Sequence, residues 1–283
     1  MTGLSRRSFM GGVMVAPLAV SQVGKPGPHG FSWTGELTQG GWLRGTAPPG
    51  TRSLTLDGAA VPLAGDGAFF IAFDRDSGSA HTLVAALDNG TRSEAALVVA
   101  PRAWQIERIN TAKRPGSAPT AEYERLRSAE LARIRAARTA VTAAAGWRQR
   151  FAWPLRGRIS GRFGAQRIYQ GEPGSYHSGL DLATGGSGAP FAAPADGVVV
   201  LAAQAPFTLE GRLLMLDHGM GLSSAFLHCS GHDVAEGDTV RQGQVIGRIG
   251  ATGRATGPHL HWGLKWRDTR LDPLLFVGAV PAG

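Results

Sequence analysis

Hydrophobic and polar positions along most of this chain alternate with the short period of β-strands. Between about residues 30 and 99, short apolar runs are separated by turn residues, at a spacing of roughly 8–12 residues that is typical of a small β-sandwich. Ser53–Leu56, the pair Asp57-Gly58 and Ala59–Leu63 predict a hairpin with a type I′ turn. Further strands are predicted at Ala68–Phe73, His81–Leu87 and Ala95–Val99. We therefore expect an Ig-like β-sandwich over residues 25–102.

The pattern changes to that of a helix after a Pro/Gly/Ser-rich linker at Lys113–Pro119. Residues 120–150 are rich in Ala, Arg and Glu, and they contain no Pro and only one Gly, Gly146. Glu and Arg recur three residues apart, which favours a solvated helix surface over a nucleic-acid-binding face. A narrow apolar stripe suits packing on a neighbouring domain; it comprises Leu131, Ile134, Ala137, Val141 and Ala144. Residues 103–150 are thus predicted to be a linker and a connecting helix.

From Phe151 onward the β pattern returns. Gly197–Leu201, Leu213–Leu216 and Leu222–His228 are predicted to be strands of a second β domain over residues 151–283. The predicted fold class is therefore mainly β, and six of the eight histidines lie in the second domain.

Two short strings in this second domain carry metal-ligating residue types. In His259-Leu260-His261, a strand would place both imidazoles on one face and Leu260 in the core. His177 and Asp181 would lie about 13 Å apart along a straight strand, too far to share one metal, so we expect a bend at Gly179. Imidazoles and a carboxylate around an open fourth position are typical of catalytic zinc. His228, in another strand-like run, is a candidate for proton transfer at the same site.

These motifs resemble those of the lysostaphin-type (LytM-like) zinc endopeptidases, which cleave peptide cross-links of bacterial peptidoglycan. The resemblance covers about residues 151–283 and rests on the His-x-x-x-Asp string, Phe226-Leu227-His228 and Gly253–His261. It implies an antiparallel β groove and sandwich that binds one Zn²⁺ per chain through His177, Asp181 and His261. It also implies that His228 and His259 form the catalytic pair, with their individual roles left open.

Two positions depart from the family pattern. Phe226 stands where tyrosine is usual, so a hydroxyl that could contact substrate is missing, and Cys229 stands where leucine is usual. A thiol nucleophile at Cys229 has no recognisable orienting partner, and we interpret it as a small buried side chain. Arg162 and Arg167 are candidates for contact with stem-peptide carboxylates.

The net charge and the N-terminal segment indicate where in the cell the protein acts. The formal net charge of +8 favours polyanionic surroundings such as nucleic acid, anionic lipid or a carboxylate-rich cell wall. Residues 1–24, with Arg6-Arg7 before a short apolar run, resemble a twin-arginine export signal. An uncleaved anchor is the alternative. With one cysteine in the chain, no intramolecular disulfide can form.

The sequence therefore predicts an exported, periplasmic or cell-envelope zinc endopeptidase that acts on peptidoglycan, with secretion also possible. It predicts no nucleic-acid partner and no integral membrane span in the mature chain, and it leaves any regulatory protein open. The alternative is a non-catalytic wall-binding or amidase-activating protein of the same fold.

Overall fold

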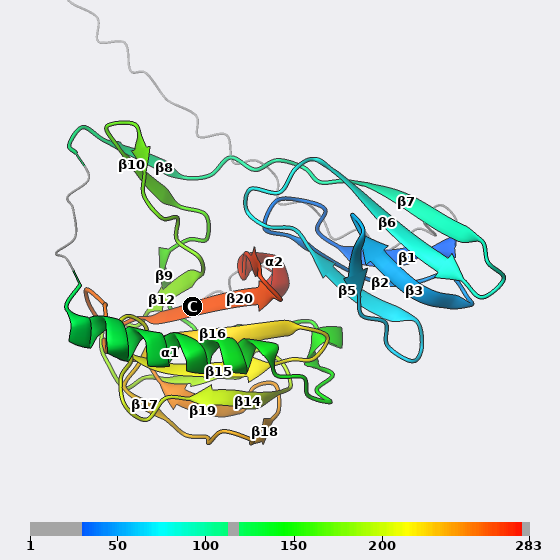
Figure 1. Ribbon diagram of the computed structural model, residues 1–283. Coiled ribbons are helices and arrows are strands. Elements are labelled where there is room, and N and C mark those ends of the chain that lie inside the picture. The colour runs from blue at the N-terminus through cyan, green and yellow to red at the C-terminus, as the bar shows by residue number, and fades with distance from the viewer. Residues whose placement is uncertain (1–29, 113–118, 279–283) are drawn as a thin grey trace, which may run out of the picture.

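The computed structural model describes residues 30–112 and 119–278. The predicted export signal at 1–24 and residues 113–118 of the predicted linker lie outside the described residues. Figure 1 shows two β domains, with the N-terminal domain in blue to cyan and the C-terminal domain in green to red. Within the described residues, no helix has the length and apolar character that crossing a bilayer requires.

The N-terminal domain is built from two antiparallel sheets that enclose a common core. One sheet has the order β1-β2-β5, with β1 at Ser32–Gly35, β2 at Trp42–Thr46 and β5 at Ala68–Ala72. The other has the order β4-β3-β6-β7, with β4 at Ala59–Val61, β3 at Thr51–Leu56, β6 at Ala80–Leu87 and β7 at Arg92–Val98. Alternate positions of β7 are buried, as a strand with one face on a core requires.

The predicted hairpin is confirmed. Asp57 and Gly58 connect β3 to β4 with φ angles of 51° and 82°, the positive values that a type I′ turn needs at both central residues. The turn twists in the same sense as its flanking strands, so it sets the pairing of Leu56 with Ala59.

The C-terminal domain contains an eight-stranded sheet whose neighbouring strands run antiparallel. Its order is β18-β14-β15-β16-β20-β12-β9, and β21 pairs with β20. These strands are β9 (Arg158–Gly161), β12 (Leu180–Ala183), β14 (Gly197–Ala202), β15 (Arg212–Asp217), β16 (Leu222–Cys229), β18 (Thr239–Val240), β20 (Leu260–Trp266) and β21 (Thr269–Leu271). A second sheet has the order β13-β19-β17, with β13 at Pro190–Ala192, β17 at Gly231–His232 and β19 at Val245–Arg248.

Alternation along the central strands gives the large sheet one buried face and one partly open face. On β20, Leu260, Trp262 and Leu264 are fully buried, whereas His261 and Lys265 are partly exposed. The buried residues belong to the main core. The opposite face is therefore free to present functional side chains.

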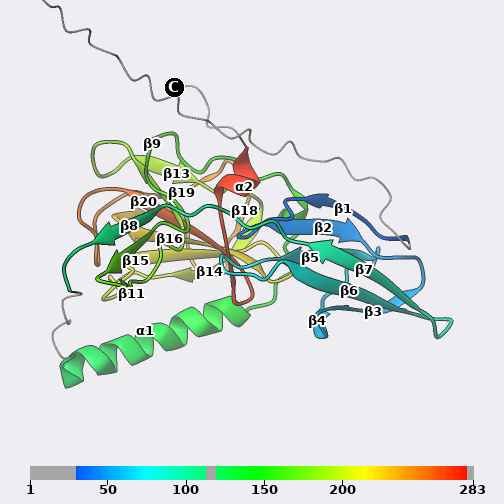
Figure 2. The same ribbon diagram turned by 90° about the horizontal axis from the view of Figure 1, so that it is seen from above.

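A helix, α1 (Ala121–Thr139), lies across part of the open face (Figure 1). Ile134 and Ala137 pack with Leu213 and Met215 of β15 in a separate small core. A 3₁₀ turn at Gly146–Arg148 follows, and a short helix, α2 (Leu274–Val277), ends the described chain. Seen from above, α1 stands apart from the N-terminal sandwich (Figure 2).

The helix is shorter than the predicted segment 120–150. The backbone turns extended at Ala140, and the backbone and side chain of Thr142 then both donate hydrogen bonds to the Asp217 carboxylate. Val141, expected on the apolar stripe, is 95% exposed. Hydrogen bonds to Asp217 of β15 therefore end the helix at Thr139, although the Ala-rich sequence that follows favours helix.

Part of the segment predicted as linker is a strand. β8 (Ile106–Ile109) pairs in parallel with β10 (Gln166–Tyr169), which forms a hairpin with β11 (Glu172–Pro173). The connection between the domains thus adds an edge to a small sheet beside the C-terminal domain (Figure 1).

Candidate metal centre and active site

Three side chains on the open face of the large sheet converge on one point. His177 Nε2 lies 3.0 Å from Asp181 Oδ1 and 3.1 Å from His261 Nδ1, and His261 Nδ1 lies 2.8 Å from Asp181 Oδ1. Ligands of tetrahedral zinc, each about 2.0–2.2 Å from the metal, lie roughly 3.3 Å from one another. Two nitrogens and a carboxylate oxygen at this spacing fit a divalent metal between them.

The local backbone explains how residues 80 positions apart meet. Asp181 on β12 pairs directly with His261 on β20 in the antiparallel register. His177 precedes β12, and the chain bends at Gly179, as predicted, so that the His177 imidazole folds back over Asp181. A Cβ at Gly179 would lie 2.6 Å from the Trp262 carbonyl oxygen and 2.7 Å from His261 Nε2. Only glycine leaves room for this bend.

Backbone carbonyls orient three of the imidazoles in the cluster. The Nδ1–H of His177 donates to the Arg162 carbonyl at 3.0 Å, that of His228 to Thr252 at 2.8 Å, and that of His259 to Gly257 at 2.8 Å. Each bond makes Nδ1 the donating nitrogen, which leaves Nε2 as the nitrogen that can bind a metal or exchange a proton. For His177, Nε2 faces the ligating atoms of Asp181 and His261.

His228 and His259 stand next to the three converging groups. Their rings lie 5.0 Å apart between centroids, and His259 Nε2 is 3.8 Å from Asp181 Oδ1. His228, at the end of β16, adopts φ = 65°, a conformation that costs energy for a residue with a side chain. The strained histidine therefore lies beside the candidate metal ligands. Backbone strain of this kind is common at functional sites.

Burial and charge set the protonation of the cluster. Burial lowers the pKa of His228 and of His261, which favours their neutral forms. Burial alone would raise the pKa of Asp181, but the hydrogen bonds and charges of His177 and His261 outweigh it and hold that pKa below its usual range. The carboxylate is therefore ionised. Asp181 in turn outweighs burial at His177 and raises its pKa.

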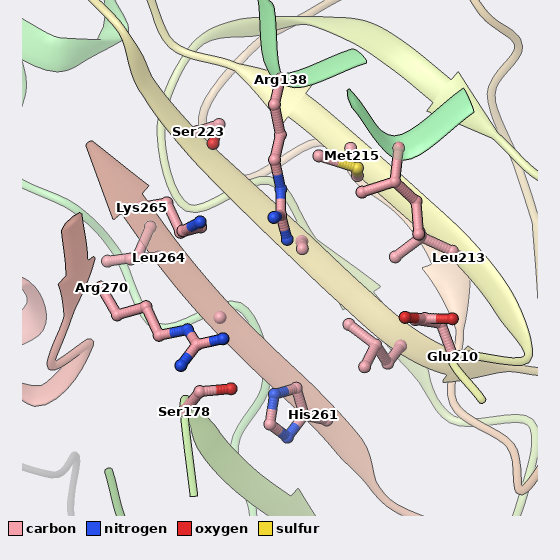
Figure 3. Close-up of a pocket in the computed structure, with 14 residues that line it drawn as sticks. Arg138, Ser178, Glu210, Leu213, Met215, Ser223, His261, Leu264, Lys265 and Arg270 are labelled. Atoms are coloured by element: carbon pink, nitrogen blue, oxygen red, sulfur yellow. The ribbon is translucent and has the colours of Figure 1, made fainter. Parts of the chain in front are cut away.

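Two hollows border this cluster, each at different residues. A larger one of about 1050 Å³ is bordered by His177 and Asp181 and extends along β10. A smaller one of about 180 Å³ is bordered by His261 and reaches under α1 (Figure 3). Arg162 and Arg167 both line the larger hollow, and Arg167 forms a 2.7 Å ion pair with Glu107 of β8.

The two residues that depart from the family pattern, Phe226 and Cys229, are both buried. Phe226 is fully buried and packs 5.1 Å from Phe191 between ring centroids, and its side chain lines neither hollow. Burial raises the pKa of the Cys229 thiol to about 12, which confirms a buried, unreactive side chain.

His218 is a residue whose place sequence reasoning missed. It directly follows β15, in the Asp217-His218-Gly219 string that is typical of a turn, and it is completely buried. Its Nδ1–H donates to the Asp196 carbonyl, and its Nε2 accepts from the Ser224 hydroxyl, which accepts from the Trp262 indole. This hydrogen-bonded chain lies directly beneath the strands that carry His228 and His261.

Comparison with known proteins identifies the domain. Residues 175–273 match the family model described as peptidase family M23. These residues form an M23 peptidase domain. The matched segment contains all five histidine and aspartate residues of the cluster.

Two curated relatives and one solved structure place the M23 domain among known proteins. The chain is 37% identical over 127 residues to the peptidoglycan DD-endopeptidase ShyA of Vibrio cholerae, covering 44% of this chain and 29% of that protein. It is 33% identical over 137 residues to the cell division protein DipM of Caulobacter vibrioides, covering 48% of this chain and 21% of that protein. The chain thus spans less than a third of either relative.

The solved structure extends the likeness beyond the M23 domain. A crystal structure described as a candidate M23 peptidase of Pseudomonas aeruginosa superposes with a TM-score of 0.66 at 27% identity. The alignment covers 86% of this chain and 96% of that one. The similarity therefore includes most of the N-terminal half as well as the peptidase domain.

Proposed function

We propose that the M23 domain is a zinc-dependent endopeptidase that hydrolyses peptide bonds of bacterial peptidoglycan. The observation that carries the proposal is the convergence of His177, Asp181 and His261, which border two hollows and have two more imidazoles beside them. Peptidoglycan enters as the substrate because it is named for the DD-endopeptidase relative.

His177, Asp181 and His261 would hold the metal, and their hydrogen bonds prepare them for it. The His177 Nδ1–H bond to the Arg162 carbonyl fixes a metal-binding tautomer before any ion arrives. The ionised Asp181 supplies the one negative charge of the set. A zinc ion in such a site supplies Lewis-acid chemistry, polarising a peptide carbonyl and lowering the pKa of water.

His228 and His259 would exchange protons with the reacting groups. Each keeps a free Nε2, because its Nδ1–H is bonded to a backbone carbonyl. A neutral imidazole accepts a proton from the attacking water and can return one to the leaving amine. Burial favours the neutral form of His228, which suits it to accepting a proton. The His259 ring lies close to it, 5.0 Å away between ring centroids.

The two hollows suit a substrate that continues on both sides of the cleaved bond. His177 and Asp181 border one hollow and His261 borders the other, so an extended peptide can cross the centre without ending there. An endopeptidase needs this open passage. Action on the cell wall also requires export, for which the twin-arginine-like segment at residues 1–24 is the candidate signal.

Zinc content and hydrolysis of purified peptidoglycan test the proposal. We expect His261→Ala to lose both bound zinc and activity, because it removes a ligand. His259→Ala is expected to keep about one zinc per chain but to lose activity by roughly 10²–10⁴-fold, the usual contribution of a positioned acid or base. His232→Ala, a histidine of β17 in the same domain, is the matched control and should keep both.

The same experiment separates the alternative of a non-catalytic wall-binding protein. That alternative predicts binding to peptidoglycan without hydrolysis by the wild type. A wild-type protein that binds no zinc, or His261→Ala and His259→Ala variants that both hydrolyse as fast as the wild type, would refute the peptidase proposal.

A further inference from the structure

Three cationic side chains share the smaller hollow beside the metal centre. Arg138 from α1, Lys265 from β20 and Arg270 from β21 all line this cavity of about 180 Å³. Figure 3 shows them reaching into it from different directions, with His261 at the edge of the same cavity. The cations and the candidate metal centre therefore border one continuous space.

Strand geometry places two of these cations face to face. Residues two apart on a strand share a face, so Lys265 lies on the same face as Gly263 and His261. Gly263 carries no side chain, which leaves the space between them open. Lys265 also pairs directly with Arg270 in the register of β20 and β21. Like charges placed directly opposite each other destabilise a sheet unless an anion lies between them.

Acidic side chains around the hollow do not neutralise this cluster. Glu210 lines the cavity, but both of its carboxylate oxygens accept hydrogen bonds from Arg127 of α1. Asp268 lies 3.9 Å from Lys265 with a fully solvent-exposed side chain, a pairing of little strength.

Among the described residues, the remaining contacts include no hydrogen bond from a side chain of these three cations to a carboxylate. Asp74 accepts a hydrogen bond from the backbone N–H of Arg270, and the Arg270 guanidinium makes one long bond, at 3.5 Å, to the Tyr176 hydroxyl. Within residues 30–112 and 119–278, no ion pair involves Arg138. Burial, followed by the charge of Arg138, lowers the pKa of Lys265 to about 8.

The helix that carries Arg138 is fixed to the domain before any ligand binds. Arg138 lies in the last turn of α1, where the backbone carbonyls favour a cation. The helix is tied to the domain by the Arg127–Glu210 pair and by two hydrogen bonds from Thr208 to Glu130. The fixed helix therefore brings the Arg138 side chain to the hollow without movement of the backbone.

We propose that Arg138, Lys265 and Arg270 form a carboxylate-binding pocket that selects peptide substrates carrying a free carboxyl group near the scissile bond. The inference rests on the proposed peptidase function and names the substrate feature that this chain reads. Four residues of extended strand span about 13 Å, so the pocket lies within roughly four residues of a bond held at His261. Arg138 stands outside the matched M23 segment, so α1 contributes to the selectivity of the domain it precedes.

The test uses two cross-linked stem peptides that differ in one group beside the cross-link, a free carboxylate in one and a carboxamide in the other. We expect the zinc-loaded wild type to cleave the carboxylate form with at least a tenfold higher kcat/KM. Arg138→Gln and Arg270→Gln should each remove this preference and lower kcat/KM on the carboxylate form about tenfold to a hundredfold, mainly through KM. Arg135→Gln removes the same charge from an arginine of the same helix that does not line the hollow, and it should keep the wild-type preference.

Binding to the zinc-loaded His259→Ala variant, measured by calorimetry, separates this inference from the peptidase proposal. Tighter binding of the carboxylate form that disappears on adding Arg138→Gln supports the pocket even if the wild type cleaves neither peptide. Cleavage of both peptides at equal rates supports the peptidase but overturns the pocket. Discrimination that survives in both Arg138→Gln and Arg270→Gln also overturns it.

Discussion

Two glycines make room for the ligating side chains of the candidate metal centre. A Cβ at Gly161 would lie 2.4 Å from Asp181 Oδ2, and one at Gly179 would lie 2.7 Å from His261 Nε2. Neither glycine needs a positive φ, so close approach alone explains the residue type. The candidate metal centre therefore depends on the absence of side chains at Gly161 and Gly179 as well as on the ligands themselves.

Gly179→Ala is expected to weaken zinc binding about tenfold to a hundredfold, the usual cost of disturbing residues that position ligands. The added methyl group would displace the His261 ring or the β20 backbone at Trp262. Competition with a chromogenic chelator measures the affinity, and thermal unfolding of the metal-free protein shows whether the fold is intact. Gly186→Ala, where a Cβ meets nothing within 4 Å, is the control. Equal zinc affinity in both variants would contradict the steric argument.

At the scale of single residues, local sequence predicted the backbone geometry of the site better than the surroundings of individual side chains. The expected bend at Gly179 and the shared face of His259 and His261 follow from chain geometry, and the structure has both. The burial of His218 did not follow, because its partners Asp196 and Ser224 come from other segments of the chain. Local sequence carries no record of such partners.

At the scale of elements, α1 is attached to the M23 domain chiefly by polar contacts. Only Ile134 and Ala137 of the helix are buried. Arg127 bonds both oxygens of Glu210, whose side chain is 18% exposed, whereas Arg125 and Glu122 form a 3.8 Å pair with both side chains about three-quarters exposed. The tertiary pair has lost most of its water, so its removal leaves a poorly solvated carboxylate.

Arg127→Ala is expected to lower the free energy of unfolding by about 1–3 kcal/mol, because Glu210 keeps its charge and loses its partner. Arg125→Ala removes an arginine from the same helix and should leave stability unchanged within error, as exposed pairs contribute little. Urea unfolding followed by circular dichroism compares the two. Equal effects would show that α1 is held without the Arg127–Glu210 pair.

The positions of most strands were predictable from local alternation, but the ends and partners of two elements were not. The Ala-rich sequence after Thr139 favours a helix, yet Thr142 bonds Asp217 and draws the chain away. The parallel pairing of β8 with β10 joins residues about 60 positions apart and has no local signal. Both outcomes depend on tertiary contacts, which outweigh local propensity.

At the scale of the whole molecule, the two domains share one apolar core. The Trp42 ring of β2 lies 5.0 Å from Phe276 of α2 between centroids, and its indole N–H donates to the Leu275 carbonyl at 3.2 Å. Arg102 and the buried Asp272 form a 2.8 Å ion pair across the same boundary. Such a boundary resembles a domain interior more than a hinge.

This continuity predicts a single cooperative unfolding transition for the zinc-loaded protein in differential scanning calorimetry. Trp42→Ala removes the ring that joins the two domains, so it should split the transition in two and lower the first midpoint by roughly 5–10 °C. Leu54→Ala empties space in the core of the N-terminal sandwich instead, and it should lower the midpoint while keeping one transition. Two transitions in the wild type would mean that the domains unfold independently, and the contacts of Trp42 would then position the sandwich without stabilising the peptidase domain.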